Sequence, residues 1–166
     1  MIYVYLQGGL GNQLFQIFTT IAYSLKHKIP FKLPTIKNDL TSPYGEIYKR
    51  PLYFDNFLKN LTPFLTNKFN HTVFWREKGH FYTEIPFCRE DILIFGYFQS
   101  FKYFDQYKNN ILRLIKFGDF KKNCGKTHNI SIHFRIGDYK HNKKAHPILS
   151  IQYYIKSLQH IIEKTN

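Results

Sequence analysis

Cysteine is scarce in this 166-residue chain: Cys88 and Cys124 stand far apart and share no metal-ligand spacing. Two such residues predict neither a disulfide framework nor a zinc site. Long apolar runs are missing too, because the most apolar helical stretch, residues 14–25, is too short to span a bilayer. The N-terminus lacks the basic and apolar segments of a signal peptide. We therefore expect a cytoplasmic protein with at most peripheral membrane association.

Acidic residues are also few, with 11 Asp and Glu against 24 Lys and Arg and a net charge of +13. Such a balance favours anionic partners, namely nucleic acid, acidic lipid or a phosphorylated small molecule. The densest clusters, residues 121–122 and 140–144, are not runs of five or six like charges. A nucleic-acid-binding protein is therefore only the second alternative. The 43% hydrophobic content is enough to build a real core.

The first residues predict a strand, a turn and a helix in succession. Residues 2–6 are β-branched and aromatic, which indicates a buried strand, and Gln7-Gly8-Gly9 closes it. Apolar residues then recur with helical spacing over 14–25, and Asn12 stands where an N-cap belongs. Residues 29–33 predict a second strand. This βαβ order predicts a parallel sheet with a right-handed crossover.

Further elements are expected along the rest of the chain. They are two weak strands that pair with each other (72–75 and 80–85), a strand at 92–97, a helix capped by Asp105 with Ile111, Leu114 and Ile115 facing inward, a strand at 130–134, and a helix capped by Ser150. The polar and basic stretch 118–129 indicates a domain boundary, and we divide the chain into residues 1–125 and 126–166. The second unit is expected to be only the start of a domain, since a strand and one helix cannot cover both faces of a parallel sheet.

The first candidate site is Gly8-Gly9-Leu10-Gly11-Asn12-Gln13. Glycines between a strand and a helix let the backbone approach a ligand at the positive helix N-terminus. The dinucleotide fingerprint fails here, because Leu14 occupies the third glycine position and no acidic residue ends the second strand. A nicotinamide enzyme is therefore not expected. The glycines either bind a ligand or only make a tight turn.

The second candidate is His133-Phe134-Arg135-Ile136-Gly137-Asp138-Tyr139. In a strand, His133 and Arg135 would project to the same side. Ligands of open α/β sheets bind beyond the carboxyl ends of strands, and the planar fork of an arginine there suits a diphosphate. The alternative is a core strand that ends in a Gly-Asp turn with a surface arginine.

The third candidate is Gly96-Tyr97-Phe98-Gln99-Ser100 followed by Lys102-Tyr103-Phe104. Its aromatic side chains could line a groove for a sugar acceptor or belong to the core. The histidines show no pair with metal-ligand spacing on a shared helix face, so we expect no metal ligands.

Taken together, these three segments resemble the alpha-1,2-fucosyltransferases. Gly8-Gly9-Leu10-Gly11-Asn12-Gln13-Leu14-Phe15-Gln16 is similar to the opening of that family, and Gly96-Tyr97-Phe98-Gln99-Ser100 with Lys102-Tyr103-Phe104 to its central segment. His133-x-Arg135-x-Gly137-Asp138-Tyr139 resembles its signature for GDP-fucose binding. The three matches occur in the family's order, which makes them more specific together than any one alone.

The resemblance implies a GT-B-like glycosyltransferase with two facing Rossmann-like domains, of which residues 1–125 would be the acceptor side and 126–166 the start of the nucleotide-sugar side. It implies inverting transfer of fucose from GDP-fucose to the 2-hydroxyl of a galactoside, without metal or other cofactor. Arg135 would contact the donor diphosphate, and Asp138 would be either a general base or a turn-holding residue. The implied substrate-binding residues are Gly9, Gly11, Asn12, Gln13, His133, Arg135, Gly137, Asp138 and Tyr139.

Two departures from the family pattern leave alternatives open. Ile136 stands where a second basic residue often follows the signature arginine, and the later family motifs that line the nucleotide pocket have no counterpart. The chain is therefore interpreted as an enzyme that is inactive alone and completed by another chain or by homodimerisation, or as a non-catalytic remnant that binds glycan.

Overall fold

The computed structural model describes residues 1–35, 51–79, 81–116, 129–141 and 147–165. The chain divides into two compact units, Met1–Gly118 and Asp119–Asn166. The division falls at one end of the polar stretch in which the sequence predicts a domain boundary. Each unit has its own architecture.

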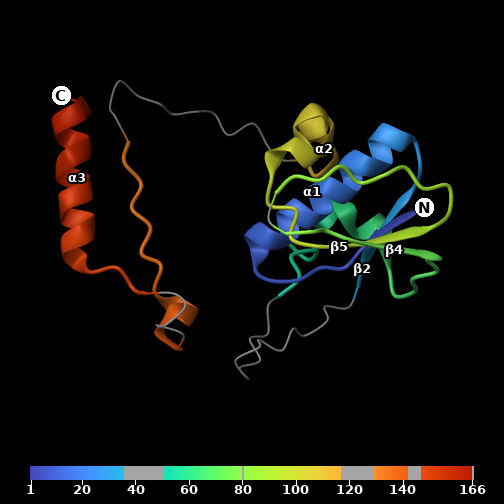
Figure 1. Ribbon diagram of the computed structural model, residues 1–166, viewed down its shortest axis with the longest axis horizontal. Helices are drawn as coiled ribbons and strands as arrows, with labels where there is room; N and C mark the ends of the chain where they lie inside the picture. The colour runs from blue at the N-terminus through green and yellow to red at the C-terminus, as the bar shows by residue number, and fades with distance from the viewer. Residues whose placement is uncertain (36–50, 80, 117–128, 142–146, 166) are drawn as a thin grey trace. The chain divides into compact units, whose positions relative to one another are not determined.

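The first unit is built on a five-stranded parallel sheet with the order β3-β2-β1-β5-β4 (Figure 1). Its strands are β1 (Ile2–Val4), β2 (Phe31–Pro34), β3 (Leu65–Thr66), β4 (Val73–Arg76) and β5 (Ile92–Phe95). The central strand β1 is buried throughout, as parallel strands are when both faces of the sheet are covered. The first unit is therefore a mixed α/β structure, compatible with a Rossmann-like fold, and the predicted parallel βαβ unit is confirmed by the pairing of β1 with β2.

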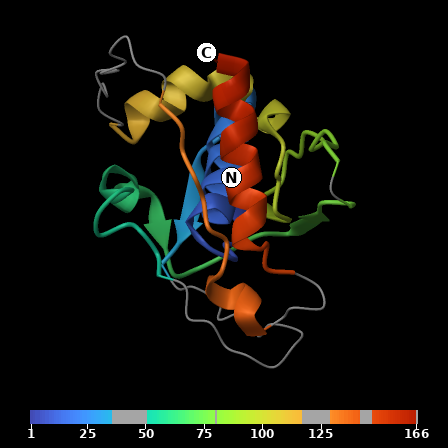
Figure 2. The same ribbon diagram turned by 90° about the vertical axis from the view of Figure 1, so that its left-hand side faces the viewer.

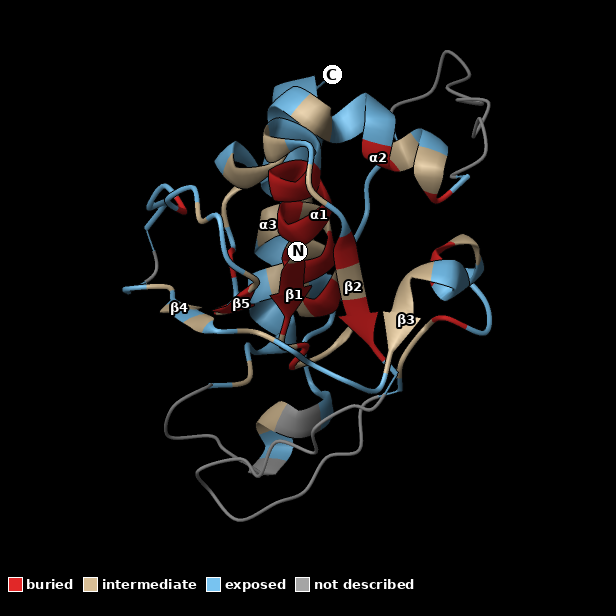
Figure 3. Cartoon of the chain, turned by 90° about the vertical axis from the view of Figure 1, so that its right-hand side faces the viewer, coloured by how far each residue is buried: buried red, intermediate tan, exposed pale blue. Residues whose placement is uncertain are grey.

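Helix α1 (Leu10–His27) follows β1 and packs on the sheet (Figure 3). Its apolar stripe places Ile17, Ile21 and Ala22 in the core at 1% exposure or less. Lys28 ends the helix in the left-handed conformation, with its N–H bonded to the Ser24 carbonyl. The predicted helix is confirmed, with a start several residues before the apolar repeat.

The predicted N-cap at Asn12 is wrong. Gly9 precedes the helix in extended backbone and Asn12 lies in the first turn. The first helical bond runs from the Gln13 N–H to the Gly9 carbonyl at 3.0 Å. A helix can begin before its apolar stripe because its first turn needs no buried face. The apolar period therefore identifies the packed part of a helix, and it locates the first helical residue less accurately.

Two predictions in the middle of the first unit are also wrong. Residues 81–85 form no strand, and β4 pairs in parallel with β5 instead of forming a hairpin. Asp105 does not cap the next helix: it begins the short 3-10 helix η3 (Asp105–Tyr107), and Tyr107 is the N-cap of α2 (Lys108–Leu114). Ile111 and Ile115 are buried as predicted, whereas Leu114 is only half-buried. Two further 3-10 helices are η1 (Lys59–Phe64) and η2 (Phe101–Tyr103).

The described part of the second unit contains the 3-10 helix η4 (Gly137–His141) and helix α3 (Ile151–Thr165). The predicted helix after Ser150 is confirmed, but the predicted strand at 130–134 is wrong. Within the unit, this segment runs alongside α3, and Phe134 packs on Tyr154 with 4.5 Å between ring centroids (Figures 1 and 2). A segment becomes a strand only when a neighbouring strand takes its backbone hydrogen bonds, and a helix cannot do so.

Among the described residues, no helix combines the length and the apolar character needed to cross a membrane.

Candidate functional site

The first and third candidate segments meet at the carboxyl ends of β1 and β5. These strands are adjacent and parallel, with Ile2 opposite Ile92 and Val4 opposite Ile94. The chain leaves β1 into the glycine turn and leaves β5 into residues 96–100. After β1 the sheet is extended on one side by β2 and β3, and later on the other side by β5 and β4. Open α/β sheets bind their ligands at such a switch point, outside the carboxyl ends of the strands.

A side-chain hydrogen bond joins the two segments. Gln99 Nε2 donates to Asn12 Oδ1 at 2.7 Å, across 87 residues of sequence. Asn12 is half-buried and Gln99 is exposed, so the bond lies at the surface of this edge. The amide that was expected to cap α1 therefore connects the glycine turn to the loop after β5.

Only one glycine of the turn is required by the backbone. Gly8 has a φ of 75°, and a Cβ there would lie 2.3 Å from Asn12 Nδ2. A Cβ at Gly9 or Gly11 would meet nothing within 4 Å. Space is therefore open over the first turn of α1, where the backbone N–H groups of a helix have no partner within the helix and the potential is positive. This combination suits an anionic or oxygen-rich ligand.

Gln13 adds a buried acceptor to the same turn. Its side chain is 1% exposed, and its Nε2 donates to the carbonyls of Gly8 at 2.9 Å and of Pro51 at 3.1 Å. Its Oε1 has no hydrogen-bond partner. Leaving such an atom unsatisfied costs about 1–3 kcal/mol. The turn therefore carries an acceptor that the fold alone leaves without a donor.

The neighbouring Gln16 behaves differently, because both ends of its amide are used. Its Oε1 accepts the Gln7 N–H at 2.9 Å, and its Nε2 donates to the Gln7 carbonyl at 3.3 Å. Gln16 is fully buried. It therefore fixes the chain that leaves β1 to the helix that follows, which holds the glycine turn in place.

Glu77, directly after β4, positions the other loop of the site. Its Oε2 accepts the N–H groups of Tyr97 at 2.9 Å and of Phe98 at 2.8 Å, and its Oε1 accepts the Tyr103 hydroxyl at 3.1 Å. A Cβ at Gly96 would lie 2.5 Å from the Glu77 Cβ, so glycine is needed there. Sequence reasoning missed Glu77. The available signal was an acidic residue at the end of a predicted strand in a chain that has few acids.

Burial, with a further contribution from the nearby Glu77 carboxylate, raises the pKa of Tyr103 to about 12. The hydroxyl is therefore protonated at neutral pH and serves as the donor to Glu77. It also accepts the Thr83 N–H at 3.0 Å. Tyr103 thus ties the loop after β5 to residues 81–85.

The aromatic residues of the third candidate segment divide between core and surface. Phe98 is fully buried and stacks on Trp75 with 6.2 Å between centroids. Phe104 packs against Phe18 of α1. Tyr97 is 37% exposed, and its ring remains accessible beside the switch point. Phe98 and Phe104 therefore belong to the core, and Tyr97 is the ring beside the switch point that a ligand could reach.

The second candidate segment belongs to the second unit. His133 and Arg135 are exposed, and the guanidinium of Arg135 lies 4.5 Å from the ring centroid of Tyr139. Gly137 begins η4, and Asp138 is its second residue. The side chain of Asp138 lies outside the described part of the structure. Because residues 130–134 are not a strand, strand alternation does not place His133 and Arg135 on a shared face.

The structure thus brings Gly9, Gly11, Asn12 and Gln13 together with the loop after β5, and it places Arg135 against Tyr139. Among the described residues, no three His, Cys, Asp or Glu side chains come together in a way that could hold a metal ion. The chain matches no protein-family model, no curated protein and no solved structure.

Proposed function

We propose that this protein belongs to the glycosyltransferases that use a sugar nucleotide. More particularly, we propose an alpha-1,2-fucosyltransferase-type protein that acts with GDP-fucose and a galactoside acceptor. The observation that supports this most directly is the hydrogen bond between Asn12 and Gln99. It joins two of the three segments that carry the family resemblance, at the edge of the sheet where α/β proteins bind ligands.

In this proposal the first unit binds the acceptor. The open space over Gly9 and Gly11 allows the ligand to approach the backbone closely. The N–H groups of the first turn of α1 then face the oxygen atoms of the ligand. The unpaired Oε1 of Gln13 offers an acceptor for a sugar hydroxyl. Sugar rings present apolar C–H faces as well as hydroxyls, and the exposed ring of Tyr97 is suited to pack on such a face.

The second unit supplies Arg135 for the donor. In the proposed reaction the 2-hydroxyl oxygen of the acceptor attacks C1 of fucose and the bond from C1 to the β-phosphate oxygen breaks, so that GDP leaves with the electron pair. The acceptor proton passes to a base, for which Asp138 is the proposed residue. A guanidinium held near the β-phosphate stabilises the negative charge that develops as the bond breaks. The guanidinium of Arg135 lies over the ring of Tyr139, and its planar fork is of the kind that can donate two bonds to phosphate oxygens.

A second candidate function is a glycan-binding protein without catalysis. It is favoured by α3, which has no buried residue within the described chain (Figure 3). A donor half with a single arginine would bind GDP weakly, with a dissociation constant of about 1 mM or higher. A complementing chain or a second copy would then be needed for transfer.

Calorimetric titration of the whole chain with GDP tests the proposal, with ADP as the control nucleotide. A family member is expected to bind GDP more tightly than ADP, even if both dissociation constants are near 1 mM. Equal affinity for the two nucleotides, or no binding of either, would contradict a GDP-fucose donor site. Low-micromolar GDP binding would exclude the non-catalytic candidate and indicate a donor site that works in this chain alone.

A further inference from the structure

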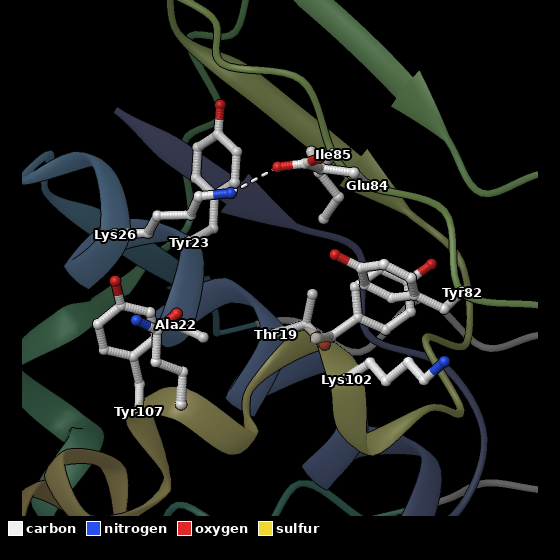
Figure 4. Close-up of a pocket in the computed structure, with 11 residues that line it drawn as sticks. Thr19, Ala22, Tyr23, Lys26, Tyr82, Glu84, Ile85, Lys102 and Tyr107 are labelled. Atoms are coloured by element: carbon white, nitrogen blue, oxygen red, sulfur yellow. Dashed lines mark hydrogen bonds and ion pairs between the residues drawn. The ribbon is translucent and has the colours of Figure 1, made fainter.

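A hollow separate from the glycine turn lies along the C-terminal half of α1 (Figure 4). It has a volume of about 90 Å³. Its walls come from α1, from residues 82–85 and from the 3-10 helices η2 and η3. Its lining includes Thr19, Lys26, Tyr82, Glu84, Lys102 and Tyr103. The first helical residue at the wall, Thr19, is nine positions after Leu10, or about 14 Å along the helix at 1.5 Å per residue.

Aromatic rings form one side of this hollow. Tyr82 and Tyr103 lie with their ring centroids 4.8 Å apart and tilted by 58°. The hydroxyl of Tyr103 is occupied by Glu77 and by the Thr83 N–H, so its ring is held in place. Tyr82 is 41% exposed and stands at the mouth (Figure 4). A fixed ring beside an exposed one forms an apolar surface on which the C–H face of a sugar can pack.

The hollow is lined by two lysines and one glutamate, so its net charge is positive. Lys26 Nζ and Glu84 Oε1 form an ion pair at 2.6 Å, so each largely cancels the other's charge. This bond raises the pKa of Lys26 and lowers that of Glu84, and both groups are therefore charged at neutral pH. Lys102 also lines the hollow and has no carboxylate partner among the described residues. The hollow therefore presents one positive charge to a ligand.

A hydroxyl lies on the floor without a partner. Thr19 is 1% exposed, and its Oγ1 has no hydrogen bond. The hydroxyl of the adjacent Thr20, in contrast, has a partner: its Oγ1 donates to the Gln16 carbonyl one turn earlier, at 2.7 Å. The hollow therefore has beside it a polar group that the fold does not satisfy.

The size of the hollow restricts what can enter. Its volume of about 90 Å³ is smaller than the cavity of roughly 150 Å³ that holds one benzene molecule when fully enclosed. Because this hollow opens to solvent, it can take one six-membered ring that remains partly exposed. A nucleotide or a folded oligosaccharide would not fit.

We propose that this hollow binds a single sugar ring that carries a carboxylate. The tyrosine rings pack on the C–H face of the sugar, Lys102 pairs with the carboxylate, and Thr19 bonds a ring hydroxyl. The site is separate from the switch point and goes beyond the proposed transferase function. It would add recognition of an acidic sugar to a protein whose own charge is strongly positive.

Galacturonate and galactose test this proposal, because they differ only in a carboxylate or a hydroxymethyl group at C6. We would titrate each sugar into the whole chain and follow binding by protein-observed NMR. We expect galacturonate to bind more tightly by up to about five-fold, the upper end of what one solvent-exposed charge pair contributes. Lys102→Gln should remove this preference, whereas Lys68→Gln, at an exposed lysine outside the hollow, should retain it.

Thr19→Val tests the floor of the hollow without changing the shape of the side chain. It should weaken both sugars equally while leaving the melting temperature unchanged or higher, because an unsatisfied hydroxyl is removed. Equal binding of the two sugars to the unmodified chain would overturn the proposal, as would no binding of either at about 50 mM, a concentration well above a millimolar dissociation constant. A preference for galacturonate that survives Lys102→Gln would also overturn it. None of these readouts involves GDP, so they fail or succeed independently of the donor site.

Discussion

The Glu77 carboxylate accepts the backbone N–H of Phe98 at 2.8 Å, in a loop where Phe98 has a positive φ of 52°. Left-handed backbone is unfavourable for a phenylalanine, by about 1–2 kcal/mol. Here the conformation is held by the two N–H bonds to Glu77 and by complete burial of the Phe98 ring. A residue at the end of β4 thus determines the shape of the loop that follows β5.

Glu77→Gln should destabilise the first unit. The substitution keeps the size of the side chain but removes the charge and one acceptor, so that either the loop N–H groups or the Tyr103 hydroxyl lose their bond. We expect a loss of about 1.5–3 kcal/mol, the range for hydrogen bonds to a charged group, measured by urea unfolding. The control is Glu84→Gln, which breaks an exposed ion pair and should change the unfolding midpoint little. Equal effects of the two substitutions would contradict the positioning role of Glu77.

Gly8→Ala and Gly11→Ala should separate the structural from the ligand-facing glycine. Gly8→Ala forces alanine into left-handed backbone and against Asn12, so stability should fall by at least about 1–2 kcal/mol. Gly11 lies in α1 with open space over its Cα, and alanine there should stabilise by up to about 1 kcal/mol. Thermal unfolding measures both.

The same Gly11→Ala variant should bind ligand less well, because its methyl group occupies the open space over the first turn. A stabilised protein that also loses nucleotide or acceptor affinity would identify that space as the binding surface. Unchanged affinity in Gly11→Ala would place the ligand elsewhere.

Gln16→Leu should cost more stability than Gln13→Leu. Removing the Gln16 amide leaves the buried N–H and carbonyl of Gln7 without their partners, at about 1–3 kcal/mol for each group. Removing the Gln13 amide frees two carbonyls but also eliminates the unsatisfied Oε1. The denaturation midpoint of Gln16→Leu should therefore be lower than that of Gln13→Leu. A lower midpoint for Gln13→Leu would show that Gln13 is the more important structural residue.

Stability should fall as the pH rises from about 10 to about 12. The pKa of Tyr103 is raised by burial from 10.0 to about 12, so the folded state holds this proton more tightly than the unfolded chain does. The contribution is fully present below pH 10 and is lost as the pH rises through the folded pKa. Burial also raises the pKa of Tyr23, in the same direction. Tyr103→Phe should therefore show a shallower decline of the urea midpoint between pH 9 and pH 12 than the unmodified chain, although it starts from a lower value.

Arg135→Lys tests the proposed donor contact. Lysine retains the charge but loses the planar fork that can donate two bonds to phosphate. In a preparation that transfers fucose, with a complementing chain if one is required, we expect a rate loss of about 100-fold, or about 2–3 kcal/mol. Arg113→Lys, at an exposed position on α2, is the matched control. Unchanged turnover in Arg135→Lys would refute the assigned role.

Local sequence patterns were sufficient to predict the helices and strands that have a clear apolar run or apolar period. The apolar runs of β1 and β5 and the helical spacing in α1 and α3 predict those elements, and the βαβ order predicts parallel pairing of β1 with β2. These features are readable because period and length depend on neighbours in the chain. The glycine turn and the loop after β5 could be nominated as site segments for the same reason.

The contacts between these segments were decided by the tertiary structure. Asn12 bonds to Gln99 because β1 and β5 are adjacent, and Glu77 reaches Phe98 because β4 lies beside β5; no local pattern contains either fact. The segment at 130–134 has strand-like residues but no strand to pair with. The amino-acid sequence by itself therefore determined which segments are helical, extended or glycine-rich. Which side chains meet at the sheet edge depends on strand order, because hydrogen bonds form between residues that only the fold makes neighbours.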